Sequence, residues 1–247
     1  MELRNTFDTV AELYEQARPT YPDELVDDLV AAIGGGRVLE IGCGTGKLTR
    51  SLVERGIDVT GIEPGTNLAT VARRVVPGVR IVEARIEDWE PDATYDAVCC
   101  ATAWHWLDAD VAAPKVHALL PPDGVLAVIG THHVFPPDED PFFREIQRYY
   151  DALGDTLDEF QDVDDIRHDD AVALRATGLF DVEDRGYLRV IDYDAESYID
   201  VLSTYSGHIA RTDDERTMLF EAVRRLAGDR TISKHHLFCL HLARKVA

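Results

Sequence analysis

Glycines at positions 42, 44 and 46 stand at the junction between a strand pattern and a helix pattern. Residues 37–41 (RVLEI) have the apolar character of a short buried strand, and residues 46–55 have that of a helix, which Gly56 ends. Glycine at such a junction lets the main chain turn sharply and approach a ligand closely. This pattern predicts a loop that binds a nucleotide or nucleoside.

Three kinds of nucleotide-binding loop carry glycines at similar spacing. A phosphate-binding P-loop needs Ser or Thr after its Gly-Lys pair and another glycine five positions before that pair, but Leu48 and Ile41 occupy these positions. A dinucleotide-binding loop is disfavoured because its third glycine falls at Lys47. The remaining kind is the Gly-x-Gly-x-Gly loop of enzymes that bind S-adenosylmethionine, a ligand without a pyrophosphate.

An acid at the tip of the next predicted strand supports a nucleoside ligand. Glu63 follows the strand pattern of residues 57–62 and lies about 20 residues after the glycine loop. An acid at this place accepts hydrogen bonds from ribose hydroxyls. We therefore assign Glu63 to the ribose.

Strand and helix patterns alternate through the first half of the chain, and two further strand patterns follow. The expected strands cover residues 37–41, 57–62, 79–82, 95–100, 125–130, 180–191 and 231–243. Strands joined by helical crossovers form a parallel sheet that is covered on both faces. We predict an α/β fold, namely a Rossmann-like, seven-stranded, mostly parallel sheet with helices on both faces and a helical cap insertion.

The alternation of strands and helices stops after Gly130. We expect one domain over residues 1–247, with a core of about residues 1–131 and 230–247 and a cap or insertion of about residues 132–229. Insertions of this kind vary most between relatives with different substrates. The cap and the N-terminal helix are therefore expected to shape the pocket for the second substrate.

Composition limits the classes of partner. The chain has 247 residues, of which 45% are hydrophobic, and this is typical of a globular protein. Its net charge of −21 repels phosphate backbones, so no nucleic-acid partner is expected. The sequence contains no run of about 18 apolar residues, so no membrane span is predicted. Residues 1–8 carry charges and no apolar signal segment, so we expect a cytoplasmic protein.

The cysteines are expected to be reduced, and the adjacent Cys99 and Cys100, which lie in an apolar run, are expected to be buried. Cys43, Cys99, Cys100 and Cys239 have no spacing typical of metal ligands or of a disulfide framework. Histidine and cysteine do not cluster with metal-site spacing either, so no metal is predicted.

Several motifs together resemble class I S-adenosylmethionine-dependent methyltransferases. They are VLEIGCGTG (38–46), GIEPG (61–65), Glu87-Asp88-Trp89 after the third strand, and Tyr95-Asp96-Ala97-Val98. One branch of this family, the small-molecule group known as type 11 or trans-aconitate-methyltransferase-like, is similar in three further segments. These are Phe7…Tyr14…Arg18-Pro19-Thr20-Tyr21-Pro22, residues 103–108 (AWHWLD) and residues 204–208 (TYSGH).

The resemblance implies a set of residues that bind S-adenosylmethionine. Glu40 and the backbone of the glycine loop would hold the methionine end, and Ala101 would contact the methionine amino group. Glu63 would take the ribose, with Pro64, Ile86 and Glu87 around the adenine. The full set assigned to the cofactor is Tyr14, Arg18, Glu40, Gly42, Cys43, Gly44, Thr45, Gly46, Glu63, Pro64, Ile86, Glu87, Ala101 and Trp104.

The chain departs from the family pattern at two positions. The family often has Asp where Arg85 stands, so no contact with the adenine amino group is assigned to this position. Pro114 falls inside a helix that the family usually runs unbroken, so this helix is expected to start late or to kink.

The implied reaction is an in-line displacement at the methyl carbon of a sulfonium, which leaves neutral adenosylhomocysteine. Such catalysis depends on positioning the acceptor and excluding water. Aromatic faces suit a cationic sulfonium. We therefore place Tyr14, Tyr21, Trp104 and Trp106 around the cofactor and acceptor, with core packing as the alternative for the two tryptophans.

An oxygen or nitrogen acceptor that must lose a proton requires a base, whereas a carboxylate acceptor does not. His105 follows the fourth strand and is the catalytic candidate, with His132, His133 and His208 as alternatives. Arg18 can pair with a carboxylate of the cofactor or of the acceptor, and a surface salt bridge is the other interpretation.

The sequence thus predicts an S-adenosylmethionine-dependent methyltransferase that acts on a small-molecule acceptor by O-, N- or carboxylate methylation. It is expected to be a monomer or homodimer. A nicotinamide oxidoreductase and a binding module that senses the cofactor without turnover are the competing functions.

Overall fold

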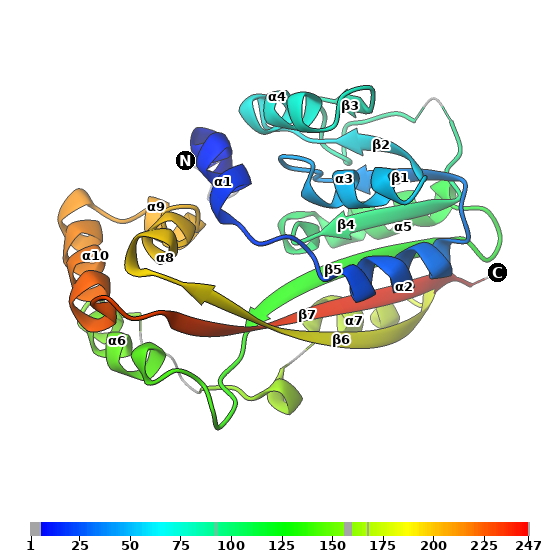
Figure 1. Ribbon diagram of the computed structural model, residues 1–247. Helices are drawn as coiled ribbons and strands as arrows, with labels where there is room; N and C mark the ends of the chain where they lie inside the picture. The colour runs from blue at the N-terminus through cyan, green and yellow to red at the C-terminus, as the bar shows by residue number, and fades with distance from the viewer. Residues whose placement is uncertain (1–5, 92, 156–159, 167, 247) are drawn as a thin grey trace. The chain divides into compact units, whose positions relative to one another are not determined.

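A computed structural model describes residues 6–91, 93–155, 160–166 and 168–246 (Figure 1). Residues 1–5, on which the prediction about a secretory signal partly rests, lie outside this part. The chain divides into two compact units. Unit 1 comprises residues 1–18, 132–166 and 188–237, and unit 2 comprises residues 19–131, 167–187 and 238–247.

One sheet contains the strands of the described chain. It has seven of them in the order β3-β2-β1-β4-β5-β7-β6. Their bounds are β1 Arg37–Ile41, β2 Asp58–Ile62, β3 Arg80–Val82, β4 Ala97–Ala101, β5 Val125–His133, β6 Phe180–Tyr193 and β7 Ile232–Lys245. The pairs β1–β2, β1–β4, β2–β3 and β4–β5 are parallel. The predicted fold class, a mostly parallel seven-stranded Rossmann-like sheet with helices, is confirmed.

The strand order reverses direction at β1. The chain moves from β1 to β2 and β3 on one side, then returns to place β4 and β5 on the other. Ile41 at the end of β1 is in register with both Ile62 of β2 and Cys100 of β4. The segments that follow these three strands therefore start side by side, at the point where open parallel sheets bind ligands.

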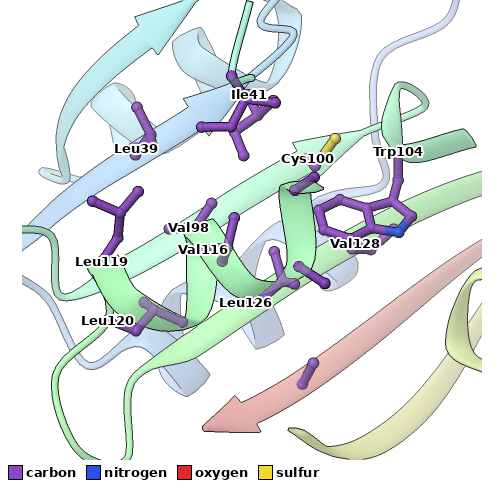
Figure 2. Packing of buried hydrophobic residues seen from close by; sticks show 14 of the residues in the cluster. Leu39, Ile41, Val98, Cys100, Trp104, Val116, Leu119, Leu120, Leu126 and Val128 are labelled. Atoms are coloured by element: carbon purple, nitrogen blue, oxygen red, sulfur yellow. The ribbon is translucent and has the colours of Figure 1, made fainter. Parts of the chain in front are cut away.

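Alternate residues of the central strands in unit 2 pack on opposite faces of the sheet. Leu39, Val98 and Leu126 belong to one buried cluster, which also contains residues of α5 (Ala109–Leu119) and α7 (Asp169–Ala176) (Figure 2). The intervening residues of the same strands belong to a second cluster, with residues of α2 (Asp23–Ile33) and α3 (Lys47–Glu54). This period of two is the pattern of strands buried on both faces.

Two local features of unit 2 refine the sequence prediction. The helix α4 (Thr66–Val75) packs beside β3. The helix α5 begins at Ala109 and contains Pro114 in its interior, so of the two expected alternatives the late start is wrong and the kink stays a prediction. Asp108 caps this helix by accepting a hydrogen bond from the Asp110 N–H at 3.1 Å. A proline inside a helix lacks one backbone donor and its ring crowds the carbonyl four residues earlier, and α5 contains it on its exposed face while Ala112, Ala113 and Val116 are buried.

Unit 1 has its own core of helices and aromatic side chains. Its helical elements are η2 Phe7–Val10, α1 Ala11–Ala17, α6 Pro141–Asp151, η4 Val163–Asp165, α8 Ala195–Leu202, α9 Ser206–Ile209 and α10 Asp213–Ala227. α10 packs against α6 and α8, and α1 packs against α8. The buried cluster between them includes Phe142, Tyr193 and Tyr198.

In the described residues no helix is long and apolar enough to cross a membrane.

Gly61 in β2 provides a test of this packing. A Cβ at Gly61 would lie 2.8 Å from the Cys43 sulfur and 2.9 Å from a methyl carbon of Ile81, so Gly61→Ala overpacks the sheet beneath the glycine loop. We expect a loss of about 1–3 kcal/mol in the free energy of unfolding, measured by urea denaturation. Gly207→Ala is the control, because a Cβ there meets nothing within 4 Å. Equal stability of the two variants would contradict the packing described here.

Candidate functional site

The glycine loop connects β1 to α3 in unit 2. The N–H groups of Gly42 and Cys43 donate to the carbonyl of Ile62 at 2.8 and 3.1 Å, and Gly46 N–H donates to the carbonyl of Cys43 at 2.8 Å. The three glycines have φ angles of 65°, 56° and 87°, which favour glycine over other residues. The loop is thus tied to the end of β2, as the strand register requires.

The close approach of the loop to the segment after β4 explains the first glycine. A Cβ at Gly42 would lie 2.8 Å from the Cβ of Ala103. Any larger residue at 42 would push the two segments apart. The narrow spacing therefore depends on glycine, and it leaves main-chain groups rather than side chains at this edge of the sheet.

Glu63 links the end of β2 to the glycine loop. Its two carboxylate oxygens accept hydrogen bonds from the N–H groups of Gly44 at 2.9 Å and Gly65 at 2.8 Å. Glu63 is only 6% exposed. The structure thus brings Glu63 next to the glycine loop, where the sequence placed it, with a carboxylate held in a fixed orientation.

Glu40 is a second buried acid beside the loop. It is 1% exposed and accepts a hydrogen bond from the Thr49 hydroxyl at 2.6 Å. Burial raises the pKa of Glu40 to about 8, the Thr49 hydrogen bond opposes this rise, and the nearby charge of Glu63 adds to it. Thr49 lies on α3, and the sequence analysis missed it because its role depends on which face of that helix meets β1.

The residue after β4 has a strained backbone. Thr102 has φ of 53°, a conformation that is rare for a β-branched residue. Its N–H donates to the carbonyl of Ile129 at 2.7 Å, and its hydroxyl donates to the carbonyl of Ala101 at 2.8 Å. Strain of this kind gathers at functional sites. No residue pattern in the sequence could have indicated it, because threonine disfavours this conformation.

The segment assigned to the adenine follows β3. Ile86 is buried in the core, and Glu87 is partly buried beside it. Burial alone would raise the pKa of Glu87, but hydrogen bonds from backbone N–H groups, including that of Asp108, and the nearby Arg85 lower it overall. Arg85 Nε lies 3.5 Å from the Glu87 carboxylate. Arg85, which stands where the family often has Asp, therefore interacts with Glu87.

Trp104 and His105 lie in a short 3-10 helix, η3 (Trp104–Trp106), after β4. Trp104 is buried in the core with Cys100 and Val128, which is the packing alternative stated above (Figure 2). His105 is exposed, and its ring centroid lies 4.8 Å from that of Trp106. Partial exclusion of water by the surrounding protein lowers the pKa of His105, and the charge of Asp170 opposes this. The neutral imidazole is thereby favoured.

Other predicted residues lie in unit 1 and form a separate group. Arg18 donates from Nε and Nη2 to the hydroxyl and carbonyl of Thr204 at 2.7 and 3.0 Å, and its guanidinium lies 5.1 Å from the Tyr14 ring centroid. The alternative bases His132, His133 and His208 also belong to this unit. Assignment of Tyr14 and Arg18 to the cofactor stays a prediction.

Comparisons with known proteins agree with this geometry. A family model described as "Methyltransferase domain" matches residues 38–124, which include the glycine loop, Glu63 and Thr102. An uncharacterized methyltransferase of Mycobacterium tuberculosis is 40% identical over 125 residues, which are 50% of this chain and 51% of the relative. Trans-aconitate 2-methyltransferase of Escherichia coli O139:H28 is 35% identical over 94 residues, 37% of each chain. The chain thus matches about half the length, or less, of these curated relatives.

A solved structure shows the same fold. A methyltransferase of Anaeromyxobacter dehalogenans described as type II has a TM-score of 0.63 at 22% identity, and the similarity covers 92% of this chain and 97% of that one. Residues 38–124 thus match a methyltransferase domain, and the relatives that are similar to half of this chain or less are methyltransferases. The family predicted from the glycine loop and Glu63 is confirmed, and with it the cofactor class.

The raised pKa of Glu40 predicts a pH-dependent stability. Between the ordinary value of 4.5 and about 8, the unfolded chain loses this proton and the folded chain keeps it, so the free energy of unfolding falls as pH rises. Glu40→Gln removes the effect. We expect the melting temperature of the variant minus that of the natural protein to increase by several degrees from pH 5 to pH 8.5, at about 2–4 °C per kcal/mol.

The control is Glu83→Gln, at an exposed acid. Ion pairing with Arg73 and the Thr66 hydrogen bond lower the pKa of Glu83, so its contribution has the opposite sign and should be small. A Glu40→Gln difference that stays constant across this pH range would show that Glu40 ionises normally.

Proposed function

We propose that the chain is an enzyme that transfers a methyl group from S-adenosylmethionine to a small-molecule acceptor, at oxygen, nitrogen or a carboxylate. One observation carries the proposal: the glycine loop, Glu40 and Glu63 come together at the ends of β1 and β2, where the strand order reverses. Main-chain groups and two carboxylates suit a ligand that has a cationic methionine end and ribose hydroxyls.

The residues present fit the cofactor by their chemistry. The chain leaves no room for a Cβ at Gly42, so the loop backbone itself lies at this edge of the sheet. Two backbone N–H groups orient the Glu63 carboxylate. Glu40 and the loop would hold the methionine end, and Glu63 and Pro64 would hold the ribose and adenine. Ile86 and Glu87 would complete the adenine side. When bound, S-adenosylmethionine supplies an electrophilic methyl group on a sulfonium.

The protein's own contribution is to position the acceptor, exclude water and, where needed, take a proton. His105 is the proposed base for an oxygen or nitrogen acceptor, since its lowered pKa keeps the imidazole neutral and able to accept. A carboxylate acceptor needs no base. Trp106, whose ring lies beside that of His105, would limit the positions open to the imidazole.

Charge supports a small acceptor rather than a nucleic acid. The chain has 46 acidic and 25 basic residues, which opposes the binding of a phosphate backbone. We also propose that the protein works in the cytoplasm as a monomer or homodimer, and the four free, buried cysteines in the described chain agree with a reducing compartment.

Binding of adenosylhomocysteine tests the site. Glu63→Ala removes both acceptors for the ribose hydroxyls, so we expect its dissociation constant, measured by titration calorimetry, to rise at least about tenfold, or about 1.4 kcal/mol. Glu83→Ala removes an exposed acid that pairs with Arg73 and should leave the dissociation constant unchanged. Unaltered affinity in Glu63→Ala would refute the ribose assignment.

Turnover separates an enzyme from a module that only senses the cofactor. Release of adenosylhomocysteine over a panel of hydroxyl, amine and carboxylate acceptors supports the proposal. Binding without release over this panel favours the sensing module. Tight binding of NADH with no binding of adenosylhomocysteine would instead favour an oxidoreductase.

A further inference from the structure

A lysine is buried among aromatic rings in unit 1. Lys234 on β7 is only 4% exposed, and its Nζ lies 5.5 Å from the ring centroids of Tyr198 and Tyr205 and 5.9 Å from that of Phe143. Among the residues that the structure describes, no carboxylate forms an ion pair with it. Burial of an unpaired ammonium is costly, and ring faces recover only part of that cost.

A second cation shares one of these rings. The guanidinium carbon of Arg18 lies 4.0 Å from the Tyr205 ring centroid, and two of its nitrogens are held by Thr204. Arg18 likewise has no acidic partner in the described part of the chain. Tyr205 thus lies next to two positive charges, and Lys234 and Arg18 both interact electrostatically with its hydroxyl.

Neighbouring groups respond to this positive potential. Burial raises the pKa of the Tyr205 hydroxyl, but Lys234 and Arg18 together bring its pKa below the usual value. Burial and the same two cations, with Arg189 and His235, lower the pKa of His236 to about 3. With its pKa lowered in this way, the imidazole of His236 is neutral near pH 7 and adds no positive charge to the region.

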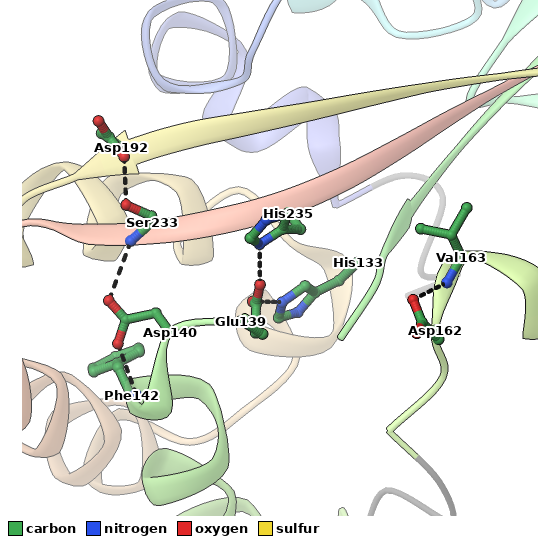
Figure 3. A network of polar contacts seen from close by, with 9 residues as sticks. All are labelled: His133, Glu139, Asp140, Phe142, Asp162, Val163, Asp192, Ser233 and His235. Carbon is green, nitrogen blue, oxygen red and sulfur yellow. Dashed lines mark hydrogen bonds and ion pairs between the residues drawn. The ribbon is translucent and has the colours of Figure 1, made fainter. Parts of the chain in front are cut away.

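The acid Glu139, which interacts with this region, is already hydrogen-bonded to two histidines. Glu139 interacts electrostatically with Lys234, but its oxygens are bonded to His133 Nε2 at 2.8 Å and to His235 Nδ1 (Figure 3). Burial raises the pKa of Glu139, and the interactions with His235 and Lys234 oppose this rise only in part. Both oxygens of Glu139 are therefore held by histidines, and in the described residues it forms no ion pair with Lys234 or Arg18.

An unpartnered hydroxyl completes the group. Tyr193 is 6% exposed, and its hydroxyl has no hydrogen-bond partner among the described residues. It interacts electrostatically with Tyr205 and Arg18. Arg18, Tyr193, Tyr205 and Lys234, here called the cationic tyrosine cluster, thus combine two cations with two hydroxyls; Tyr193 and Lys234 are buried, and Arg18 and Tyr205 are partly buried.

We propose that the cationic tyrosine cluster binds an oxyanion, a carboxylate or phosphate group, of the molecule that accepts the methyl group. The proposal rests on the proposed function, because it assigns the anion to the acceptor. Charged and hydroxyl donors form strong hydrogen bonds with such oxygens. An anion would give Lys234 and Arg18 the counter-charge, and Tyr193 the partner, that the chain itself does not provide.

The test is binding of defined anions to the full chain. Succinate, citrate and inorganic phosphate are titrated at low salt into the natural protein and into Lys234→Met, whose side chain has similar length and no charge. We expect at least one anion to bind, and its dissociation constant to rise at least about tenfold in Lys234→Met and in Arg18→Gln. Neutral succinamide should not bind. Binding of succinate or citrate but not phosphate assigns a carboxylate, and the reverse assigns a phosphate.

Matched controls separate this site from general effects. Arg224→Met removes a positive charge from an exposed ion pair with Glu196 in the same unit and should leave anion binding unchanged. Lys234→Met should remain folded, since replacing a buried charge by an apolar side chain is often neutral or stabilising. Lys234→Arg keeps the charge and should retain part of the affinity.

Two outcomes would overturn the proposal: no binding of any of the three anions, or equal binding by the natural protein and Lys234→Met. Either leaves the proposed function standing if adenosylhomocysteine still binds and is released on turnover. Failure of the natural protein to bind adenosylhomocysteine would instead refute the proposed function itself. The two failures are therefore distinguishable.

Discussion

The close contact between the backbone of Gly42 and the side chain of Ala103 is the constraint on which the site depends. It requires glycine at the end of β1 and places the segment after β4 next to the loop. The register of β1 with both β2 and β4 places the ends of these three strands side by side, so the three segments that follow them start at one edge of the sheet. Thr102, with its strained backbone, directly precedes Ala103, and the Glu63 carboxylate accepts a hydrogen bond from Gly44 of the same loop.

Two carboxylates near the same loop are held in different ways. Glu63 is oriented by backbone N–H groups, so it is fixed as an acceptor. Glu40 has one hydroxyl donor and is otherwise enclosed by the core, and its burial favours the protonated form. The two acids therefore differ in what constrains them: backbone N–H groups orient Glu63, whereas burial determines the protonation of Glu40.

The sequence predicted those features that depend on local pattern. The glycine spacing, the position of Glu63 after a strand and the alternation of strands and helices are all local, and each is confirmed by the structure. Features that depend on side-chain direction or distant contacts were not predictable. Thr49 meets Glu40 only through the rotation of α3, and Thr102 adopts a conformation that its residue type disfavours. Lys234 and Arg18 meet at Tyr205 from opposite ends of the chain, so no spacing could relate them.

The protonation of Glu40 has a thermodynamic consequence for any cation that settles beside it. With a pKa of about 8, this carboxyl is largely neutral near physiological pH, and an adjacent positive charge favours its ionisation. Association is then coupled to the departure of a proton into solvent. The heat measured on binding of the cation therefore includes the ionisation enthalpy of the buffer that takes up that proton. Binding of a positive charge beside Glu40 is thus coupled to proton release.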